Sequence, residues 1–257
     1  MRFFGCTSYD GTHYHGWQKQ DTTPETIQAY IENSLSILLR APIQITGCGR
    51  TDAGVHARGY YFHFDHITTF NYKDVVYHAN KILPAAITLH HIVPMDTELH
   101  ARFDAKRRSY IYKIKLDKNP FLPFHTEWPY ELTQAGFSLL NALAEEIKKA
   151  EDFTSFCKTG SDVENCRCTI YESYWTWQPN ENELCYHITA NRFLRGMIRL
   201  LTGMMLNVLR GKVTMEQAKA ALHHQAALKM AWSTPPNGLT LHAVDYEKEE
   251  LPPITMV

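Results

Sequence analysis

The sequence lacks a large net charge, a long apolar run and an apolar leader. Its 26 lysine and arginine residues nearly balance 27 aspartate and glutamate residues, for a formal net charge of −1. A polyanionic partner would therefore have to be held by a local basic patch. No apolar run approaches the roughly 18 residues that a membrane-spanning helix needs. Because the N-terminus also lacks the apolar segment of a signal peptide, we expect a cytoplasmic protein.

Concentrated metal ligands and cofactor motifs are also missing. The six cysteines are scattered and are expected to be free thiols. Cys166 and Cys168 are spaced C-x-C rather than C-x-x-C, and His13 and His15 have no carboxylate at ligand spacing. The chain contains no Walker loop, no dinucleotide-binding fingerprint and no serine nucleophile elbow. We expect neither a metal nor a cofactor.

What is present is the composition of an ordinary globular protein. The 257 residues, 44% of them hydrophobic, suffice for one large or two modest domains. Helical and strand periodicities alternate irregularly, which favours an α+β fold over a regular βαβ series. The expected helices are 22–40, 73–81, 132–150, 192–210 and one from 214, and the expected strands are 2–8, 42–47, 59–65, 87–93, 111–116, 168–178, 183–190 and 239–246. With a proline-containing linker at 117–123, two α+β halves with a cleft between them are the natural architecture.

The segment from Gly47 to Arg58 has the most unusual local chemistry. Its glycines allow backbone conformations that other residues resist. Arg50 and Asp52 flank a threonine, and the small residues at 53 and 54 leave room beside the Asp52 carboxylate for a planar ligand. The pattern suits catalysis, although a surface loop with a satisfied Asp–Arg pair is the alternative from composition alone.

A second segment places arginines at helical spacing. Arg192, Arg195 and Arg199 are three and four residues apart, which predicts one stripe along a helix. One of them would be buried against a carboxylate while the others face phosphates. An ordinary amphipathic helix with solvated arginines is the alternative. Gly196 and Gly203, seven residues apart in the same segment, would let another backbone approach closely.

A third segment combines basic and aromatic residues. Four basic residues between 102 and 108 precede Tyr110 and Tyr112 on a predicted strand. Rings for stacking and charges for the backbone suit a single-stranded or extruded base. The alternative is a core tyrosine stripe beside a solvated charge run.

The sequence GRTDAGVHA at 49–57 resembles the signature of the TruA-type tRNA pseudouridine synthases. Further stretches resemble motifs of this family in the same order, so the resemblance spans residues 1 to about 247. They are YDGTHYHGWQKQ at 9–20, N-x-x-L-P at 80–84, HARF at 100–103, RRSY at 107–110, DFTSF at 152–156, M-I-R at 197–199 and G-L-x-L-x-x-V-x-Y at 238–246.

The resemblance implies a cofactor-free isomerisation of uridine to pseudouridine in the anticodon stem–loop of tRNA, at tRNA positions 38–40. Asp52 would be the nucleophile, attacking either C1′ of the ribose or C6 of the base. Tyr110 would pack on the target base and could also move a proton, and Arg199 would pair with Asp52 and keep it ionised. Arg50 would help either to hold the extruded nucleotide or to fill the gap that it leaves. Contacts with the RNA backbone would come from Arg58, Arg107, Arg108, Arg192 and Arg195.

The family fold that the resemblance implies is α+β, with two similar halves that form a mixed, largely antiparallel sheet and a central active-site cleft. An N-terminal domain at 1–104 would carry Asp52, a C-terminal domain at 105–247 would complete the cleft, and a tail would follow at 248–257. The resemblance also implies a homodimer in which one tRNA touches both subunits. Two local basic patches would then form one track for the RNA.

Three positions depart from the family pattern. Tyr60 stands where the family commonly has glutamine, so a polar contact below the Asp52 loop is expected to be lost. Arg195 and Gly196 stand where a histidine or another aromatic residue is often found, and Ser109 interrupts a run that is often Arg-Tyr-Arg-Tyr. None of the three departures falls on a residue expected to act in catalysis, so they bear on substrate choice rather than on activity.

Three other hypotheses remain. An RNA-binding or RNA-folding protein could use the same cleft without turnover, although it would have no need of a carboxylate facing an anionic ligand. A pseudouridine synthase could act on another RNA, because fold and motif do not fix the substrate. A metal-dependent hydrolase could be built on His13, His15, Asp52 and His56, which metal analysis of the purified protein would test.

Overall fold

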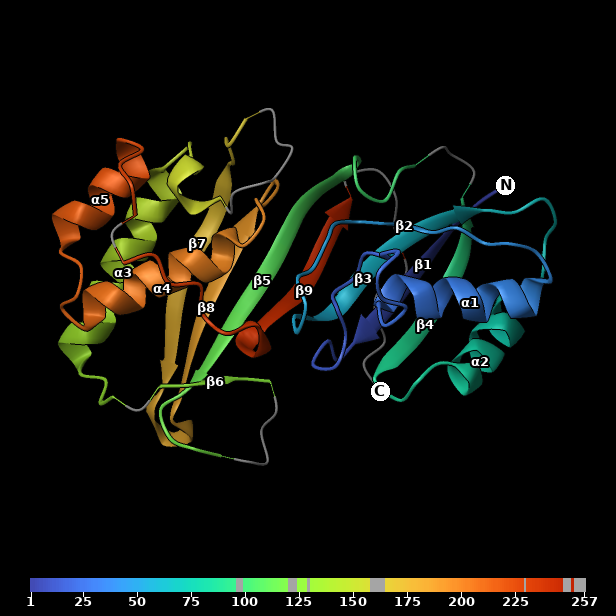
Figure 1. Ribbon diagram of the computed structural model, residues 1–257, viewed down its shortest axis with the longest axis horizontal. Coiled ribbons are helices and arrows are strands. Elements are labelled where there is room, and N and C mark those ends of the chain that lie inside the picture. Colours follow the sequence, from blue (N-terminus) through green and yellow to red (C-terminus); the bar gives the residue numbers. More distant parts are fainter. Residues whose placement is uncertain are drawn as a thin grey trace. The chain divides into compact units, whose positions relative to one another are not determined.

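The structure is a computed structural model that describes residues 1–95, 99–119, 124–128, 130–157, 165–228, 230–246 and 251. The chain forms two compact units, of which the first comprises Met1–Arg107 and Thr240–Val257 and the second comprises Arg108–Leu239 (Figure 1). Each unit combines helices with strands, which confirms the predicted α+β class. The prolines of the predicted 117–123 linker, and the predicted 248–257 tail apart from Leu251, lie outside the described residues.

The first unit is built on a mixed, mainly antiparallel set of strands. Its strands are β1 (Arg2–Tyr9), β2 (Thr46–Gly47), β3 (His56–Asp65), β4 (Ile87–Met95) and β9 (Leu239–Tyr246). Their order is β4-β1-β3-β9, with β2 beside β3. Neighbours run antiparallel except for β9, which runs parallel to β3. The predicted mixed, largely antiparallel pairing is confirmed, but the strand expected at 42–47 is reduced to two residues.

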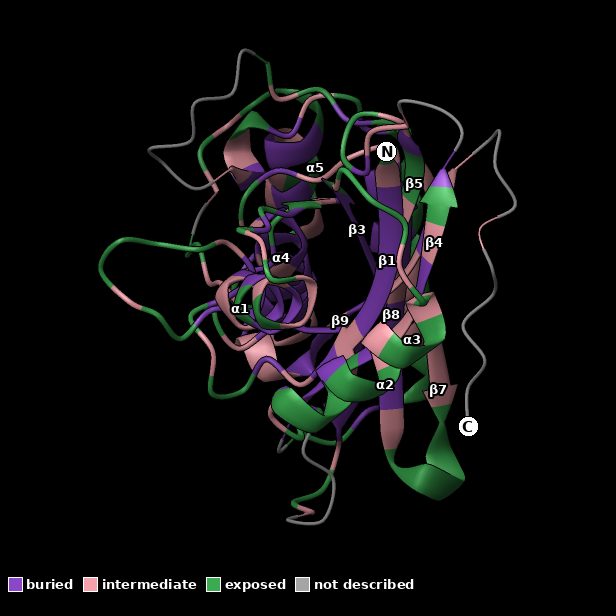
Figure 2. Cartoon of the chain, turned by 90° about the vertical axis from the view of Figure 1, so that its right-hand side faces the viewer, coloured by how far each residue is buried: buried purple, intermediate pink, exposed green. Residues whose placement is uncertain are grey.

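Two helices pack against the strands of this unit. Helix α1 (Ile27–Leu39) begins after Thr26, whose hydroxyl accepts from the amide of Ala29 at 3.4 Å. The predicted helix begins five residues earlier, at residue 22, but the Thr-Thr-Pro-Glu run at 22–25 precedes the cap. Helix α2 (Tyr72–Ile82) contacts β4 and α1 and buries only Ala79, so Figure 2 shows it mostly exposed or intermediate.

The second unit contains an antiparallel set in the order β5-β8-β7. Its helices pack with α3 against β7 and with α4 and α5 against α3. The elements are β5 (Ala105–Lys115), which begins in the first unit, β6 (Thr126–Glu127), α3 (Gln134–Lys149), η1 (Thr154–Phe156), β7 (Ile170–Gln178), η2 (Pro179–Glu181), β8 (Glu183–Ala190), α4 (Met197–Leu209), α5 (Met215–His223) and η3 (Pro236–Gly238). The predicted capping box at the start of α5 is present between Thr214 and Gln217.

The helix expected over 192–210 is shorter than predicted. It begins at Met197, after Gly196 with φ of 73°, a left-handed conformation that glycine adopts without strain. Arg192 and Arg195 precede this cap and are not helical. The predicted arginine stripe along one helix is therefore wrong, because the helix contains only Arg199.

The last strand belongs to a different unit from the one that the sequence predicts. The sequence was divided at 104/105, with 105–247 as one domain, whereas residues from Thr240 group with the first unit and the other division falls after Arg107. The reason is strand pairing, because Thr240 and Leu241 of β9 pair with His56 and Ala57 of β3. In the described part of the chain, no helix is both long and apolar enough to cross a membrane.

A buried histidine anchors the turn at 100–103 to the first unit. His63 on β3 is 6% exposed, and its Nδ1 accepts from the amide of Ala101 at 3.1 Å. The Ala101 carbonyl in turn accepts from the hydroxyl of Tyr246 on β9 at 2.6 Å. Burial, with the charges of Arg2 and His100, lowers the pKa of His63 to about 4.

This lowered pKa predicts an acid-dependent loss of stability. Folding favours the neutral imidazole, so its contribution is complete above the unfolded pKa near 6.5 and is lost as pH falls toward about 4. The difference corresponds to about 3 kcal/mol. In His63→Asn, the side-chain oxygen can still accept from Ala101 but does not titrate. Urea unfolding between pH 7 and pH 4 should show a smaller loss for His63→Asn than for the wild type, and equal losses would contradict this role.

Candidate active site

Asp52 lies in the loop of residues 48–55 between β2 and β3, within the first unit. The loop begins with a bond from the Cys48 amide to the Tyr61 carbonyl at 2.8 Å and closes with one from the Val55 amide to the Asp52 carbonyl at 3.1 Å. Gly54 has φ of 78°, so the glycine predicted to give this segment conformational freedom uses it. The Asp52 side chain is half-buried at the bend.

The segment at 9–17 supports this loop through hydrogen bonds. The Trp17 amide donates to the carbonyl of Thr51 at 3.2 Å, and the Gly54 amide donates to the carbonyl of Tyr14 at 3.3 Å. The hydroxyls of Tyr9 and Thr51 are 2.9 Å apart. Two motifs far apart in the sequence therefore form one local structure around Asp52.

Two glycines allow these segments to touch. A Cβ atom at Gly16, which has φ of 84°, would lie 2.5 Å from the carbonyl oxygen of Thr51. One at Gly11 would overlap the carbonyl group of Val55. Any side chain at either position would push the 9–17 segment away from the Asp52 loop, which explains why the motif needs glycine there.

Two stacked aromatic side chains, Trp17 and Tyr60, pack beside the loop. Tyr60 stacks on Trp17 with ring centroids 3.8 Å apart, and both side chains are buried. The Tyr60 hydroxyl donates to the carbonyl of Gly49. The expectation that the residue at position 60 would lose a polar contact below the loop is wrong, because the phenol reaches the loop backbone.

His56 has a structural environment rather than that of a metal ligand. It is 3% exposed, and its Nδ1 accepts from the Gly11 amide at 3.1 Å and lies 3.1 Å from Oδ1 of Asp10. Burial acts to raise the pKa of Asp10, but hydrogen bonds from Thr12 and the charge of His56 together lower it. Among the residues that the structure describes, no three His, Cys, Asp or Glu side chains are grouped to hold a metal ion, and His13, His15, Asp52 and His56 are all described.

The second unit holds Tyr110 and Arg199. Tyr110 lies on β5 opposite Ile188, half-buried, with its ring edge-on to Phe193 at 5.2 Å. Arg199 lies in the first turn of α4, also half-buried, and its Nε donates to the carbonyl of Thr234 at 2.6 Å. The backbone of Arg199 accepts from the Thr234 amide at 3.2 Å, so both sides of this contact are fixed within the unit.

Tyr112, two residues beyond Tyr110 on β5, belongs to the core. It is fully buried, and its hydroxyl donates to the carbonyl of Pro235 at 2.8 Å and contacts the hydroxyl of Thr126 at 2.7 Å. Burial raises the pKa of Tyr112, while its hydrogen bonds and the charge of Arg199 act against the rise. Of the two tyrosines on this strand, only Tyr110 is partly accessible to a ligand.

The remaining arginines fall into two groups. The exposed side chains are Arg50, Arg58, Arg107 and Arg195. Arg192 is half-buried, and its guanidinium donates to the carbonyls of Arg167 and Asn165 at 3.0 and 2.5 Å. Arg108 is half-buried as well and donates to the carbonyl of Asn191 at 2.8 Å.

Sequence analysis singled out the Asp52 loop but missed some of the residues that hold it. Gln28 and Glu32 are polar, yet they lie on the face of α1 that also carries the buried Ile31 and Leu35. A polar pair one turn apart on the apolar face of a helix was the available signal, because such residues are buried only when they have specific partners.

Comparison with known proteins identifies a family whose model matches this chain. Residues 6–104 and 150–247 match a family model described as tRNA pseudouridine synthase. These ranges include the Asp52 loop, the segment that supports it and α4 with Arg199.

Several curated bacterial proteins are similar to the chain over nearly its whole length. The relative from Bacteroides thetaiotaomicron is 36% identical over 97% of this chain and 92% of its own length. The relative from Parabacteroides distasonis is 37% identical over 98% of both chains. The one from Dictyoglomus thermophilum is 35% identical over 93% of this chain and 97% of its own. All three are named tRNA pseudouridine synthase A.

Proposed function

We propose a reaction and its residues from one premise: the chain belongs to the family of tRNA pseudouridine synthases. The protein is an isomerase that converts uridine in tRNA to pseudouridine. Within tRNA, we propose the anticodon stem–loop, at tRNA positions 38–40, as the target, following the motif resemblance. The observation that carries the proposed mechanism is the Asp52 loop, which presents a half-buried carboxylate on a backbone held from two sides.

The reaction balances without a cofactor or a redox step. The bond from N1 of uracil to C1′ breaks, the base turns, and a bond forms from C5 to C1′. The hydrogen at C5 leaves as a proton, and N1 gains one. Asp52 attacks either C1′ or C6 and is released at the end, so a carboxylate is the one nucleophile required.

The roles proposed for the other site residues follow the family resemblance. A uridine in a folded RNA must be extruded, at a cost of a few kcal/mol that stacking and charge have to offset. We assign stacking on the base to Tyr110, whose ring is partly accessible beside Phe193. Arg199 is assigned to pair with Asp52 and keep the carboxylate ionised, and the exposed Arg50 to hold the extruded nucleotide.

We propose that arginine side chains contact the phosphates of the tRNA. The exposed Arg58, Arg107 and Arg195 can reach an RNA backbone directly. We assign further contacts with the RNA backbone to Arg108 and Arg192, whose guanidinium groups also donate to backbone carbonyls. Because the net charge is only −1, binding of tRNA would depend on such individual arginines rather than on the charge of the whole chain.

Release of the C5 hydrogen provides a direct test of turnover. Purified wild-type protein would be mixed with an unmodified tRNA transcript that carries tritium at C5 of uridine, and tritium in water would be counted. We expect release from tRNA and much less from ribosomal or messenger RNA fragments of equal uridine content. Binding without release would instead support the RNA-folding alternative, and preferential release from another RNA would support a different substrate.

We also propose a cytoplasmic homodimer. The location follows from a tRNA substrate, and the dimer follows from the resemblance to symmetric enzymes in which one RNA touches both subunits. The chain has a mass of 29.7 kDa, so light scattering during size-exclusion chromatography should give about twice that mass. A monomer mass at micromolar concentration would contradict the dimer.

A further inference from the structure

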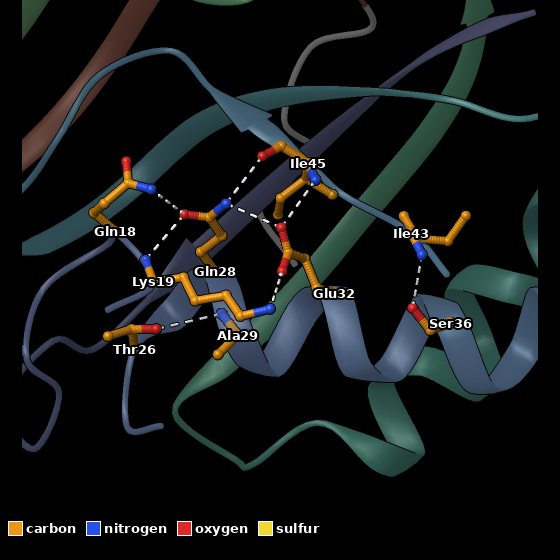
Figure 3. Close-up of polar contacts among 9 residues, drawn as sticks. All are labelled: Gln18, Lys19, Thr26, Gln28, Ala29, Glu32, Ser36, Ile43 and Ile45. Carbon is orange, nitrogen blue, oxygen red and sulfur yellow. Dashed lines mark hydrogen bonds and ion pairs between the residues drawn. The ribbon is translucent and has the colours of Figure 1, made fainter. Parts of the chain in front are cut away.

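A buried polar network connects α1 to both segments that flank the Asp52 loop (Figure 3). Gln28 and Glu32 lie one turn apart on α1 and are 8% and 6% exposed. Burying an amide and a carboxylate costs free energy unless both are hydrogen-bonded. The partners of these two side chains therefore indicate what the network holds in place.

Gln28 uses its full hydrogen-bonding capacity to bridge two segments. Its Oε1 accepts from Nε2 of Gln18 at 2.8 Å and from the amide of Lys19 at 3.0 Å. Its Nε2 donates to the carbonyl of Ile45 at 3.1 Å and to Oε1 of Glu32 at 2.9 Å. Two accepted and two donated bonds are typical of a fully satisfied side-chain amide.

Glu32 forms hydrogen bonds to the same two segments, at Lys19 and at Ile45. Its Oε1 also accepts from the amide of Ile45 at 3.1 Å, so both backbone groups of Ile45 are held by α1. Its Oε2 accepts from Nζ of Lys19 at 3.1 Å. Gln28, Lys19 and Ile45 all act as donors to this carboxylate, which an amide at position 32 could not match.

Both segments are connected to the Asp52 loop, one along the chain and the other through a backbone hydrogen bond. Ile45 immediately precedes β2, which pairs with β3 and runs into the 48–55 loop. On the other side, the Trp17 amide donates to the carbonyl of Thr51, and the Trp17 carbonyl accepts from the amide of Gln28 at 3.0 Å. The network thus fixes the spacing between the two flanks of the loop.

We propose that Gln28 and Glu32 are positioning residues for Asp52, acting through the 17–19 segment and Ile45 rather than by touching the substrate. The proposal rests on the proposed function, because it concerns the placement of the nucleophile. Displacing a reacting group by about 1 Å can cost about 100-fold in rate. Loosening the network should therefore reduce the rate of the chemical step more than it reduces the affinity for tRNA.

The main test variant is Gln28→Met, which keeps the length of the side chain and removes all four of its bonds. We expect kcat to fall about 10- to 100-fold with KM for tRNA within about threefold. Hydrogen exchange at the Val55 amide, which closes the loop on Asp52, should become at least about tenfold faster. Glu32→Gln preserves volume, should change kcat in the same direction, and decides the matter if Gln28→Met shows no cooperative unfolding.

Ser36→Ala is the matched control. Ser36 lies on α1 and accepts from the amide of Ile43 at 2.9 Å, so it ties the same helix to the same segment farther along the chain from Asp52. Removing this bond should leave kcat within about twofold of the wild type and exchange at Val55 unchanged. A purely structural role for the network predicts similar kinetics in the two variants.

The outcomes separate this inference from the proposed function. If the wild type is active, kcat values for Gln28→Met and Glu32→Gln within twofold of Ser36→Ala, or a loss confined to KM, would overturn the positioning role. If the wild type is inactive on tRNA, the proposed function fails, and exchange at Val55 decides alone. Faster exchange in Gln28→Met than in Ser36→Ala would then still support the network as the device that fixes the loop, and equal exchange would overturn it.

Discussion

Replacing Asp52 with asparagine should reduce pseudouridine formation to below about 1% of the wild-type rate while tRNA binding stays within about threefold. Loss of a nucleophile normally costs orders of magnitude in kcat. Binding should survive because the amide has the same size and removes a negative charge next to an anionic ligand. The bond from Val55 to the Asp52 carbonyl is a backbone contact, so the loop should keep its conformation.

Tritium release and filter binding on the same preparation would measure both quantities. Asp65→Asn is the matched control, because Asp65 is on β3 in the same unit and forms an exposed ion pair with Arg2, of a kind worth about 1 kcal/mol or less. It should keep full activity. Activity above 1% in Asp52→Asn would count against nucleophilic attack by this residue. A large loss of tRNA affinity would indicate that Asp52 acts in substrate binding rather than in catalysis.

Gly203→Ala should destabilise the protein by about 3 kcal/mol, lowering the unfolding temperature by about 10 °C. A Cβ atom at this buried position of α4 would overlap the carbonyl oxygen of Trp232. Backbone cannot yield as a flexible side chain does. The segment that would be displaced continues to Thr234, whose carbonyl accepts from Arg199, so activity should fall together with stability.

Gly136→Ala gives the contrast on α3. A Cβ atom there would meet the end of the Leu209 side chain at 2.8 Å, which can move. Because alanine also favours the helix by up to about 1 kcal/mol, thermal unfolding of Gly136→Ala should be unchanged or slightly improved. Similar unfolding temperatures for the two variants would show that the close approach of α4 to Trp232 is not a tight contact.

Periodicity and local chemistry were enough to predict many of the elements. The strand at 183–190 has the predicted bounds, the capping box at Thr214 is present, and the aromatic face of 59–65 is buried. Of the two glycines at which a close backbone approach was expected, Gly203 has one, whereas Gly196 is the left-handed cap of α4. These features depend on neighbouring residues, so a pattern in the sequence is sufficient to reveal them.

The errors arose where distant residues decide the structure. Gly196 takes a left-handed conformation and starts α4 after Arg195, whereas the arginine spacing alone suggested one continuous helix. The final strand joins the first unit because its partner is β3, more than 170 residues earlier, and no local pattern encodes that pairing. Arg192 is bound to carbonyls of a loop that its own spacing does not reveal.

The site shows the same division. Asp52 could be singled out from the residues around it, because glycine, small side chains and opposite charges are concentrated in a few positions. The support from Trp17, Tyr60 and Gln28 could not, since it depends on how the 9–17 segment and α1 fold against the loop. In the sequence alone, the residues that hold the Asp52 loop are not distinguishable from other core residues.

Mapping pseudouridine at single-nucleotide resolution would test the central claim most directly. An unmodified tRNA transcript would be treated with the wild type and with Asp52→Asn in parallel. Our account predicts new pseudouridine in the anticodon arm with the wild type and none with the variant. Equal modification by both proteins, or wild-type modification only outside the anticodon arm, would contradict it.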